Sequence, residues 1–139
     1  MIQPDTEQVL EMMRVFYASP AVFSNGSDEI FRNDIASCVG DCPYLEGYIF
    51  EDDANILGYA MIAKSFSTEL GKPCIWIEDL YIKPEARGIG IGKEFMAYIK
   101  QKYSECAMCL EVEEENQNAI SLYKRCGFEI WPYVEMKKR

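Results

Sequence analysis

Histidine is absent from this sequence of 139 residues. The side chain that most often moves protons near neutral pH is therefore missing, and any such role falls to carboxylates. The same absence disfavours a structural zinc site. Cys106 and Cys109 have finger-like spacing, but Cys38 and Cys42 form the only other close pair of cysteines. We expect no bound metal.

Positive charge is also scarce, with 14 Lys and Arg against 23 Asp and Glu and a net charge of −9. Binding to nucleic acid without sequence preference requires a basic face, so the composition argues against a nucleic-acid partner. The acidic excess fits a cationic small molecule drawn to an acidic cleft. It equally fits a well-solvated surface that aids solubility.

Long apolar runs are missing too. No stretch reaches the ~18 apolar residues that a membrane-spanning helix needs. Residues 1–5 lack the charged and apolar regions of a signal peptide, so we expect a cytoplasmic protein with no membrane partner. Hydrophobic residues make up 49% of the chain, and no linker or repeat interrupts it. Residues 1–139 are therefore expected to form one domain with its own core.

The order of expected elements indicates an α/β fold. Apolar residues at helical spacing predict helices near residues 5–18 and 28–39, a third beginning near residue 93, and a fourth over 119–126. Strands are predicted at 47–51, 56–63, 74–82, 108–112 and 128–136. The run at 74–82 is nearly continuous in apolar residues, which is typical of a central strand covered on both faces.

Three glycines follow that central strand in the run Arg87-Gly88-Ile89-Gly90-Ile91-Gly92. Glycine lets the backbone approach a bulky anion, and a helix N-terminus adds free N–H groups and a positive dipole end. The run therefore predicts a phosphate-binding loop. Its spacing fits neither the G-x-G-x-x-G dinucleotide fingerprint nor the G-x-x-x-x-G-K-[ST] loop of nucleoside triphosphate enzymes.

Two segments together carry a family resemblance. Arg87, Gly90 and Gly92 fit the pattern R/Q-x-x-G-x-G/A, and residues 116–128 fit N-x-x-A-x-x-L-Y-x-x-x-G-F. In this order and at this separation they resemble the two signature motifs of the GNAT superfamily, the acetyl-coenzyme A dependent N-acetyltransferases. The resemblance extends over most of the chain, and residues 77–81 look most like the polyamine and diamine branch.

The resemblance implies a single-domain α/β fold with a mixed, mostly antiparallel central sheet. Helices would flank the sheet, which would splay apart at its central parallel strand pair. The family usually begins with a full strand, but only residues 1–3 precede Pro4 here. We therefore expect that edge strand to be very short or absent.

The resemblance also implies acetyl-CoA as co-substrate and a set of residues that bind it. Backbone groups of Leu80 and Ile82 would pair with the pantetheine arm, and Asn116 would contact it. The pyrophosphate would lie on the N–H groups of residues 88–93 beside the Arg87 side chain. The complete expected set is Leu80, Ile82, Arg87, Gly88, Ile89, Gly90, Ile91, Gly92, Lys93, Asn116, Ala119 and Tyr123. For Asn116, an ordinary helix N-cap is the alternative role.

Two side chains are predicted to be catalytic. The resemblance implies that Tyr123 is the proton donor to the departing thiolate. A free tyrosine has a pKa of ~10 and a thiol a pKa of ~8.5, so full proton transfer would be uphill. We therefore expect a strong hydrogen bond from Tyr123 to the thiolate and not complete donation of the proton. The acceptor amine must lose a proton, and Glu78 is the best candidate base because it interrupts an otherwise apolar strand. Asp79, expected on the opposite side of that strand, is the fallback.

The predicted function is N-acetylation of a primary amine, on a small molecule or a protein, by direct attack through a tetrahedral intermediate. The backbone near Leu80 would hold the oxyanion. Without histidine to activate a thiol, a route through an acyl-cysteine is disfavoured. A GNAT-fold module that binds acyl-CoA or a partner protein without turnover is the alternative, and a homodimer is possible. The sequence does not identify the residues that bind the acceptor. Five aromatic residues could form an acceptor pocket or belong to the hydrophobic core, and we favour the core (Phe16, Tyr17, Phe23, Phe31 and Tyr44).

Overall fold

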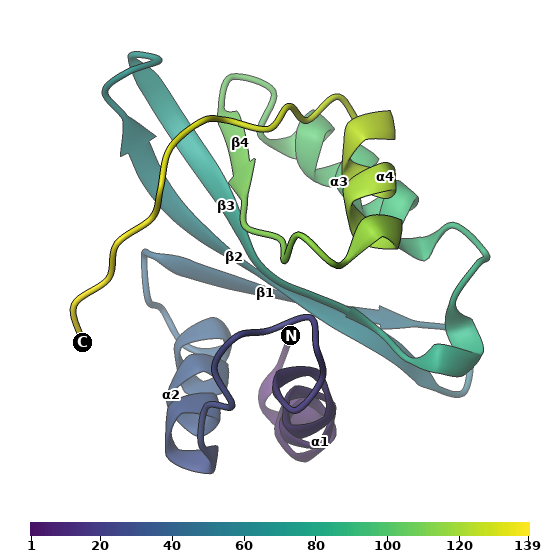
Figure 1. Cartoon of the computed structure of the whole chain (residues 1–139). Coiled ribbons are helices and arrows are strands. Elements are labelled where there is room, and N and C mark those ends of the chain that lie inside the picture. Colours follow the sequence, from purple (N-terminus) through teal and green to yellow (C-terminus); the bar gives the residue numbers. More distant parts are fainter.

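The computed structural model describes the whole chain, Met1–Arg139. It contains helices α1 (Thr6–Tyr17), α2 (Asp28–Val39), α3 (Ile91–Lys102) and α4 (Gln117–Arg125). Its strands are β1 (Leu45–Glu51), β2 (Ile56–Ser67), β3 (Lys72–Ile82) and β4 (Ala107–Leu110), and two short 3₁₀ helices lie at Gln3–Asp5 and Pro84–Ala86. The four strands form one sheet in the order β1-β2-β3-β4 (Figure 1). The first three run antiparallel and β4 runs parallel to β3, so the predicted mixed sheet is confirmed.

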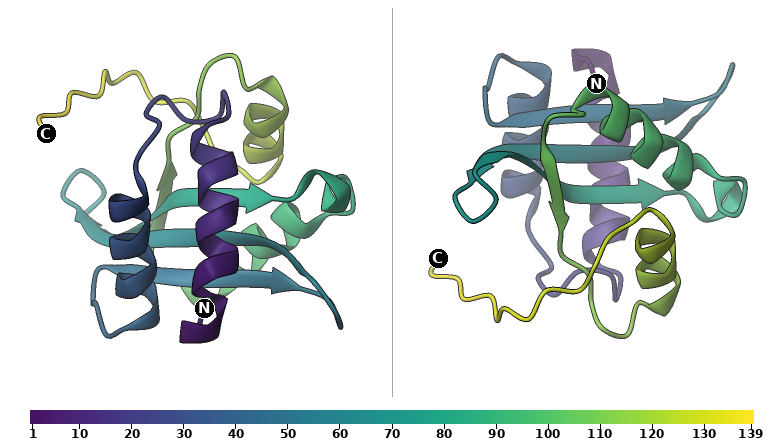
Figure 2. Two further views of the ribbon diagram at one scale, coloured as in Figure 1. Left: turned by 90° about the horizontal axis from the view of Figure 1, so that it is seen from below. Right: turned by 90° about the horizontal axis from the view of Figure 1, so that it is seen from above.

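Helices cover both faces of the sheet, as the apolar run of β3 predicted. Helices α1 and α2 lie on one face and α3 and α4 on the other (Figures 1 and 2). Each interface has its own core cluster: Val9, Leu10 and Met13 of α1 pack in one, and Phe95 and Ile99 of α3 in the other. The sheet is therefore the middle of three layers.

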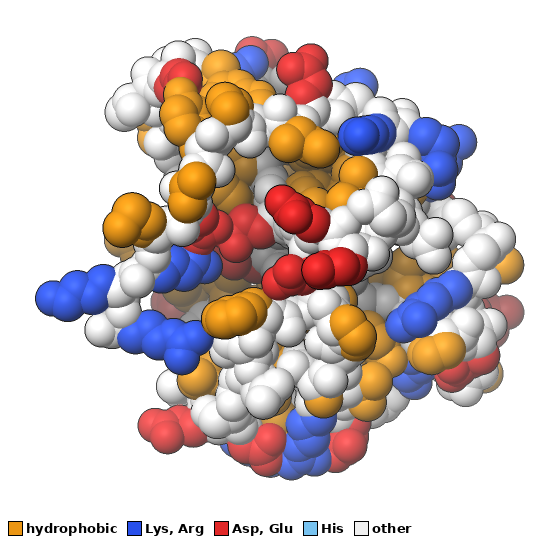
Figure 3. Space-filling model, in the orientation of Figure 1, with side chains coloured by type: hydrophobic (Ala, Val, Ile, Leu, Met, Phe, Trp, Pro, Cys, Tyr) orange, Lys and Arg blue, Asp and Glu red, His pale blue; other side chains and the backbone are white.

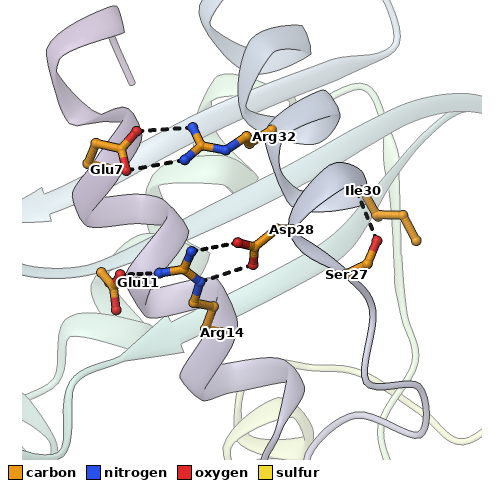
Figure 4. Close-up of polar contacts among 7 residues, drawn as sticks. All are labelled: Glu7, Glu11, Arg14, Ser27, Asp28, Ile30 and Arg32. Carbon is orange, nitrogen blue, oxygen red and sulfur yellow. Dashed lines mark hydrogen bonds and ion pairs between the residues drawn. The ribbon is translucent and has the colours of Figure 1, made fainter.

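Helices α1 and α2 are also joined by ion pairs at their surface. Arg14 reaches both carboxylate oxygens of Asp28, at 3.0 and 2.6 Å, and Arg32 binds Glu7 at 3.0 Å (Figure 4). The Ser27 hydroxyl caps α2 by accepting a hydrogen bond from the Ile30 N–H. Exposed pairs of this kind contribute little stability.

A β-bulge interrupts the pairing of β3 with β2 at Glu78. Met61 lies opposite Asp79 and Ile62 opposite Ile77, which leaves Glu78 as an extra residue without a partner on β2. A bulge of this kind resets the alternation of side chains between the two faces. As a result, Ile77 packs against α3 while Asp79 faces α1.

The parallel pairing of β3 with β4 ends at the same place. It runs only from Cys74–Ala107 to Ile77–Leu110, so the remainder of β3 extends beyond β4. The predicted splay at the parallel pair is confirmed. The two strands diverge beside the bulge that carries Glu78.

The strand predicted at residues 128–136 is wrong. No residue beyond Phe128 belongs to a strand, and the large side chains Ile130, Tyr133, Val134 and Met136 are exposed. Pro132 lacks an N–H for a strand ladder, and β4 offers an edge of only four residues. At the other end no strand precedes α1, within the expectation of a very short or absent one.

Candidate active site

The glycine run forms an open loop at the start of α3. Gly88 and Gly90 have φ angles of 80° and 91°, in the region that favours glycine, and nothing lies within 4 Å of where a Cβ would point from either. Gly90 occupies the N-cap position without a side chain to cap the helix. The first intrahelical bond runs from the Glu94 N–H to the Gly90 carbonyl, so the N–H groups of residues 88–93 donate no hydrogen bond within the chain. A twelve-residue helix thus directs free donors into open space, which suits an anion.

Arg87 binds its own loop with only part of its guanidinium group. Its Nε donates to the Ile82 carbonyl at 2.8 Å, and the group lies 5.8 Å from the centre of the Tyr81 ring. The two Nη atoms make no contact with an acceptor of the chain and remain available to an anion. Ile89 and Lys93 are exposed, Ile91 is half-buried, and Gly92 is buried close to Ile82 and Leu122.

The backbone of Leu80 and Ile82 faces the gap beside β4. Opposing residues of an antiparallel pair alternate between bonded and unbonded positions. The Lys83 N–H donates to the Leu57 carbonyl, so Lys83 and Leu57 form a bonded pair. The pair Ile82–Gly58 is one residue further along the ladder and Leu80–Ala60 is three residues further, so by the alternation both are unbonded pairs. Their N–H and C=O groups consequently point away from β2, toward the side where β4 has already ended.

A cavity of about 100 Å³ occupies that gap, and we call it the strand-gap cavity. Most of its lining is hydrophobic, and the walls come from β3, β4, α4 and the end of α1. Among the predicted site residues it brings together Glu78, Leu80, Asn116, Ala119 and Tyr123. Residues about 40 positions apart in the sequence thus meet at one point.

Asn116 and Tyr123 sit at the two ends of α4. The Asn116 Oδ1 accepts a hydrogen bond from the Ala119 N–H at 3.3 Å, so this residue is the N-cap of α4 as well as part of the cavity wall. Tyr123 is half-buried, and its hydroxyl makes no hydrogen bond within the chain. Burial raises the pKa of Tyr123, and nearby Cys126 adds to the rise. The hydroxyl therefore stays protonated and able to donate.

Glu78 also borders a second cavity, on the α1–α2 side of the sheet. This acidic cavity has a volume of about 250 Å³ and is lined by Tyr17, Asp34, Tyr44, Leu45, Met61, Ala63, Glu78 and Asp79. The prediction that Asp79 lies on the opposite side of the strand from Glu78 is thus wrong. The bulge turns both side chains toward the same cavity.

The two neighbouring carboxylates are held differently. Asp79 is only 3% exposed, and its oxygens accept hydrogen bonds from Tyr17 at 2.8 Å and Tyr59 at 2.7 Å. Burial raises the pKa of Asp79 to about 6, although both tyrosine bonds lower it. Glu78 makes no hydrogen bond, and partial desolvation raises its pKa, with Lys137 offsetting the rise. Glu78 is the carboxylate that is free to accept a proton.

The aromatic residues near the site divide between core and cavity. Phe31 is buried in the core, as expected, whereas Phe23 is 92% exposed. Tyr17 and Tyr44 line the acidic cavity, and Phe16 lines the strand-gap cavity while packing on the core. Asp34 and Glu111 were missed as cavity residues. Only the fold places them there, since neither belongs to a motif.

None of the six cysteines lines either cavity. All six cysteines are free, and no group of three or more His, Cys, Asp or Glu side chains is arranged to hold a metal ion. The Sγ atoms of Cys74 and Cys109 lie 2.8 Å apart on adjacent strands. None of the helices is both long enough and apolar enough to cross a membrane.

Sequence comparison identifies the family. Residues 8–128 match the acetyltransferase (GNAT) family, and the chain belongs to it. The peptidyl-lysine N-acetyltransferase YiaC of Escherichia coli (strain K12) is 31% identical over 85 residues, which are 61% of this chain and 51% of YiaC. The thialysine N-epsilon-acetyltransferase of Bos taurus is 36% identical over 75 residues, 52% of this chain and 44% of that protein. The chain thus spans about half the length of these curated relatives.

Solved structures show the same fold. The aminoglycoside N-acetyltransferase AAC(6')-Iy, solved with CoA, superposes with a TM-score of 0.80 at 16% identity, covering 100% of this chain and 91% of that one. A possible acetyltransferase from Clostridium difficile 630 gives a TM-score of 0.79 at 18% identity, with 98% and 91% covered. The GNAT fold predicted from the two motifs is therefore confirmed.

Proposed function

We propose that this chain transfers the acetyl group of acetyl-CoA to a primary amine. The observation that carries the proposal is a continuous track along the open side of β3. The track begins at the free N–H groups of residues 88–93, follows the backbone of Ile82 and Leu80 that faces away from β2, and ends between Tyr123 and Glu78. Along it, the Ile82 carbonyl already accepts a hydrogen bond from the Arg87 Nε. The track offers anion donors, an extended backbone partner and two reactive side chains, in the order in which CoA carries its pyrophosphate, its amide arm and its thioester.

The residues of the track fit the pieces of that ligand. The loop donors and the Nη atoms of Arg87 would hold the pyrophosphate. The Leu80 and Ile82 backbone would pair with the amides of the arm, because unpaired strand groups need partners. Asn116 caps α4 with Oδ1, which leaves its amide NH₂ free to donate to the arm.

Glu78 would take the proton that the acceptor must lose. An alkylammonium has a pKa of ~10.4, so only about one molecule in a few thousand is neutral at pH 7. Glu78 stands between the two cavities without a hydrogen bond of its own, and partial desolvation raises its pKa, which makes it a better base than a fully solvated carboxylate. Asp79 is less suited, since both of its oxygens already accept tyrosine hydroxyls.

Tyr123 would stabilise the leaving group. The amine nitrogen forms a bond to the thioester carbon, and the tetrahedral intermediate collapses as the carbon–sulfur bond breaks, giving an amide and CoA. Because burial raises the pKa of Tyr123 above that of a thiol, the hydroxyl would donate a hydrogen bond to the developing thiolate rather than surrender its proton first. Two protons leave the nitrogen of an ammonium acceptor in all. Glu78 would take the first before the attack and pass it to solvent, and the second, lost from the nitrogen of the tetrahedral intermediate, would end on the sulfur, so that CoA leaves as a thiol.

The names of the relatives agree with an amine acceptor. They include a peptidyl-lysine, a thialysine and a spermine/spermidine acetyltransferase, all of which modify amines. The spermine/spermidine N(1)-acetyltransferase of Bacillus subtilis (strain 168) is 28% identical over 97 residues, 64% of this chain and 62% of its own length.

Release of free thiol from acetyl-CoA, followed in a spectrophotometer, tests the proposal. We expect thiol release that depends on the added amine, and an acetylated amine of matching amount by mass spectrometry. Calorimetry of CoA binding is the companion measurement. Tight CoA binding without turnover on any amine would instead identify a non-catalytic acyl-CoA-binding module.

A further inference from the structure

The acidic cavity adjoins the strand-gap cavity at Glu78, which lines both. It has a volume of about 250 Å³ and shares Glu78 with the strand-gap cavity. Helix α2 supplies Asp34, β3 supplies Glu78 and Asp79, and Tyr17 and Tyr44 form aromatic walls. A small molecule bound here would reach the thioester by passing Glu78.

The cavity contains negative charge that the protein does not neutralise. None of its three carboxylates, Asp34, Glu78 and Asp79, takes part in an ion pair, and no Lys or Arg lines it. Lys137, whose charge acts on Glu78, lies in ion pairs with Glu135 at 3.0 Å and Glu111 at 3.8 Å. By contrast Glu46, a partly buried carboxylate on β1, is bound by both Lys64 and Lys102. The protein thus provides Glu46 with two ion-pair partners but provides none for the three carboxylates of the acidic cavity.

The three carboxylates come from two different elements, Asp34 from α2 and Glu78 and Asp79 from β3. Glu78 lies at the junction of the cavities, where the reacting nitrogen must be. Asp34 comes from the opposite wall, is half-buried, and has no hydrogen-bond partner. Tyr44 is 70% exposed and Tyr17 is half-buried, and both line the cavity together with the carboxylates. Aromatic faces and carboxylates together suit alkylammonium groups.

We propose that the acidic cavity binds the second ammonium group of a linear diamine or polyamine, whose first amino group is acetylated beside Glu78. The inference rests on the proposed acetyl transfer and names its acceptor class. An acceptor that carries a carboxylate would be repelled by the same three side chains, and a monoamine would leave Asp34 without its counter-ion. The cavity therefore selects for two positive charges joined by an alkyl chain.

Acceptors of matched length provide the test, with thiol release measured on the full chain at one pH. The set is 1,5-diaminopentane, 1-aminopentane, 5-aminopentanoate and an N-terminally blocked lysine peptide. We expect kcat/KM for the diamine to exceed that for 1-aminopentane at least tenfold, with 5-aminopentanoate lowest. The advantage should appear mainly in KM, because a distant anchor binds the ground state and the transition state alike.

A variant assigns the preference to the cavity. Asp34→Asn should lower the ratio of kcat/KM for diamine over monoamine about tenfold, and Asp34→Glu should retain most of that ratio. Asp53→Asn, on the exposed β1–β2 turn, removes one negative charge elsewhere and should leave the ratio unchanged. An unchanged ratio in Asp34→Asn would overturn the assignment.

Failure of the inference and failure of acetyl transfer give different results. Turnover that is equal for all the amines, or fastest with the lysine peptide, would overturn the diamine site and leave acetyl transfer standing. If no amine supports turnover, acetyl transfer fails, and calorimetry then decides the cavity on its own. Diamine binding at least tenfold tighter than 1-aminopentane binding supports the site, and equal binding overturns it.

Discussion

The packing around Tyr123 determines both the protonation state and the accessibility of its hydroxyl group. The neighbouring ring of Phe128, with ring centres 5.9 Å apart, packs against it, and the wall of the strand-gap cavity shields it from solvent. Its hydroxyl has no partner in the chain, so under the proposed mechanism it would be free to donate a hydrogen bond to the thiolate. The same burial that raises its pKa keeps the proton in place until then.

Replacing Tyr123 with phenylalanine removes that donor and little else. We expect Tyr123→Phe to lower kcat on the order of 100-fold, the smaller end of what a positioned proton donor contributes. The affinity for acetyl-CoA should change less than twofold, because the ring still fills its place. Steady-state kinetics with calorimetry measures both.

The matched control for this change is Tyr98→Phe. Tyr98 is a half-exposed tyrosine on α3 that does not line either cavity, so kcat should be unchanged. An unaltered kcat in Tyr123→Phe would exclude Tyr123 from the mechanism.

At the scale of elements, the loop before α3 depends on backbone conformation more than on side chains. Gly90 has a φ of 91°, and the space beyond its missing Cβ is open. A side chain there would meet nothing in the protein, but it would project into the space where an anion would lie against the free N–H groups. Loss of binding and loss of stability can therefore be separated.

Gly90→Val should abolish measurable CoA binding while leaving a folded protein. The strain of a β-branched residue at this φ costs about 1–3 kcal/mol of stability. Gly71→Val is the matched control, because Gly71 has a φ of 66°, open space at its Cβ, and a place on the distant β2–β3 turn. It should lose similar stability in urea and keep its CoA affinity. Full CoA binding by Gly90→Val would contradict the role of the loop.

The elements themselves were largely predictable, because periodicity and capping residues act over a few neighbours. Helix α2 begins after its cap Ser27, and α4 after its cap Asn116, as local pattern rules require. The bulge at Glu78 was not predictable, since it depends on the register with β2, and it reversed the expected face of Asp79. The final strand was predicted from apolar residues alone, which cannot reveal whether a free edge of sufficient length exists.

The candidate site, like the fold, was predictable from the sequence only in part. Residues of the two motifs were located because each motif is a continuous segment, and the structure places Leu80, Asn116, Ala119 and Tyr123 around one cavity. Asp34 was not located, because it reaches the cavity only through the packing of α2 on the sheet. The residues proposed to bind acetyl-CoA thus lie mostly in continuous sequence segments, whereas those proposed to bind the acceptor come together only through tertiary structure.

For the whole molecule, carboxylates dominate the dependence of stability on pH. Asp79 has its pKa raised from 3.8 to about 6, so it stabilises the fold fully below pH 3.8 and loses that contribution as the pH rises through 6. Glu46 has its pKa lowered from 4.5 to about 2 by Lys102, Lys64 and Tyr103 against its own desolvation. Its contribution is present above pH 4.5 and is lost as the pH falls through 2. The two effects cross near pH 4 to 5.

We therefore expect the melting temperature to be highest near pH 4 to 5 and lower at pH 8 than at pH 5 by about 5 °C. The shift at Asp79 alone corresponds to on the order of 2 kcal/mol, which moves the melting temperature of a domain this size by several degrees. The net charge of −9 acts in the same direction, but added salt screens it, whereas the buried Asp79 is screened little. Asp79→Asn should therefore flatten the decline between pH 5 and pH 8 in 0.5 M salt, and Asp53→Asn should not. A wild-type chain that melts at the same temperature at both pH values would show that Asp79 is ionised in the fold at no cost, so that its two tyrosine hydroxyls fully replace water.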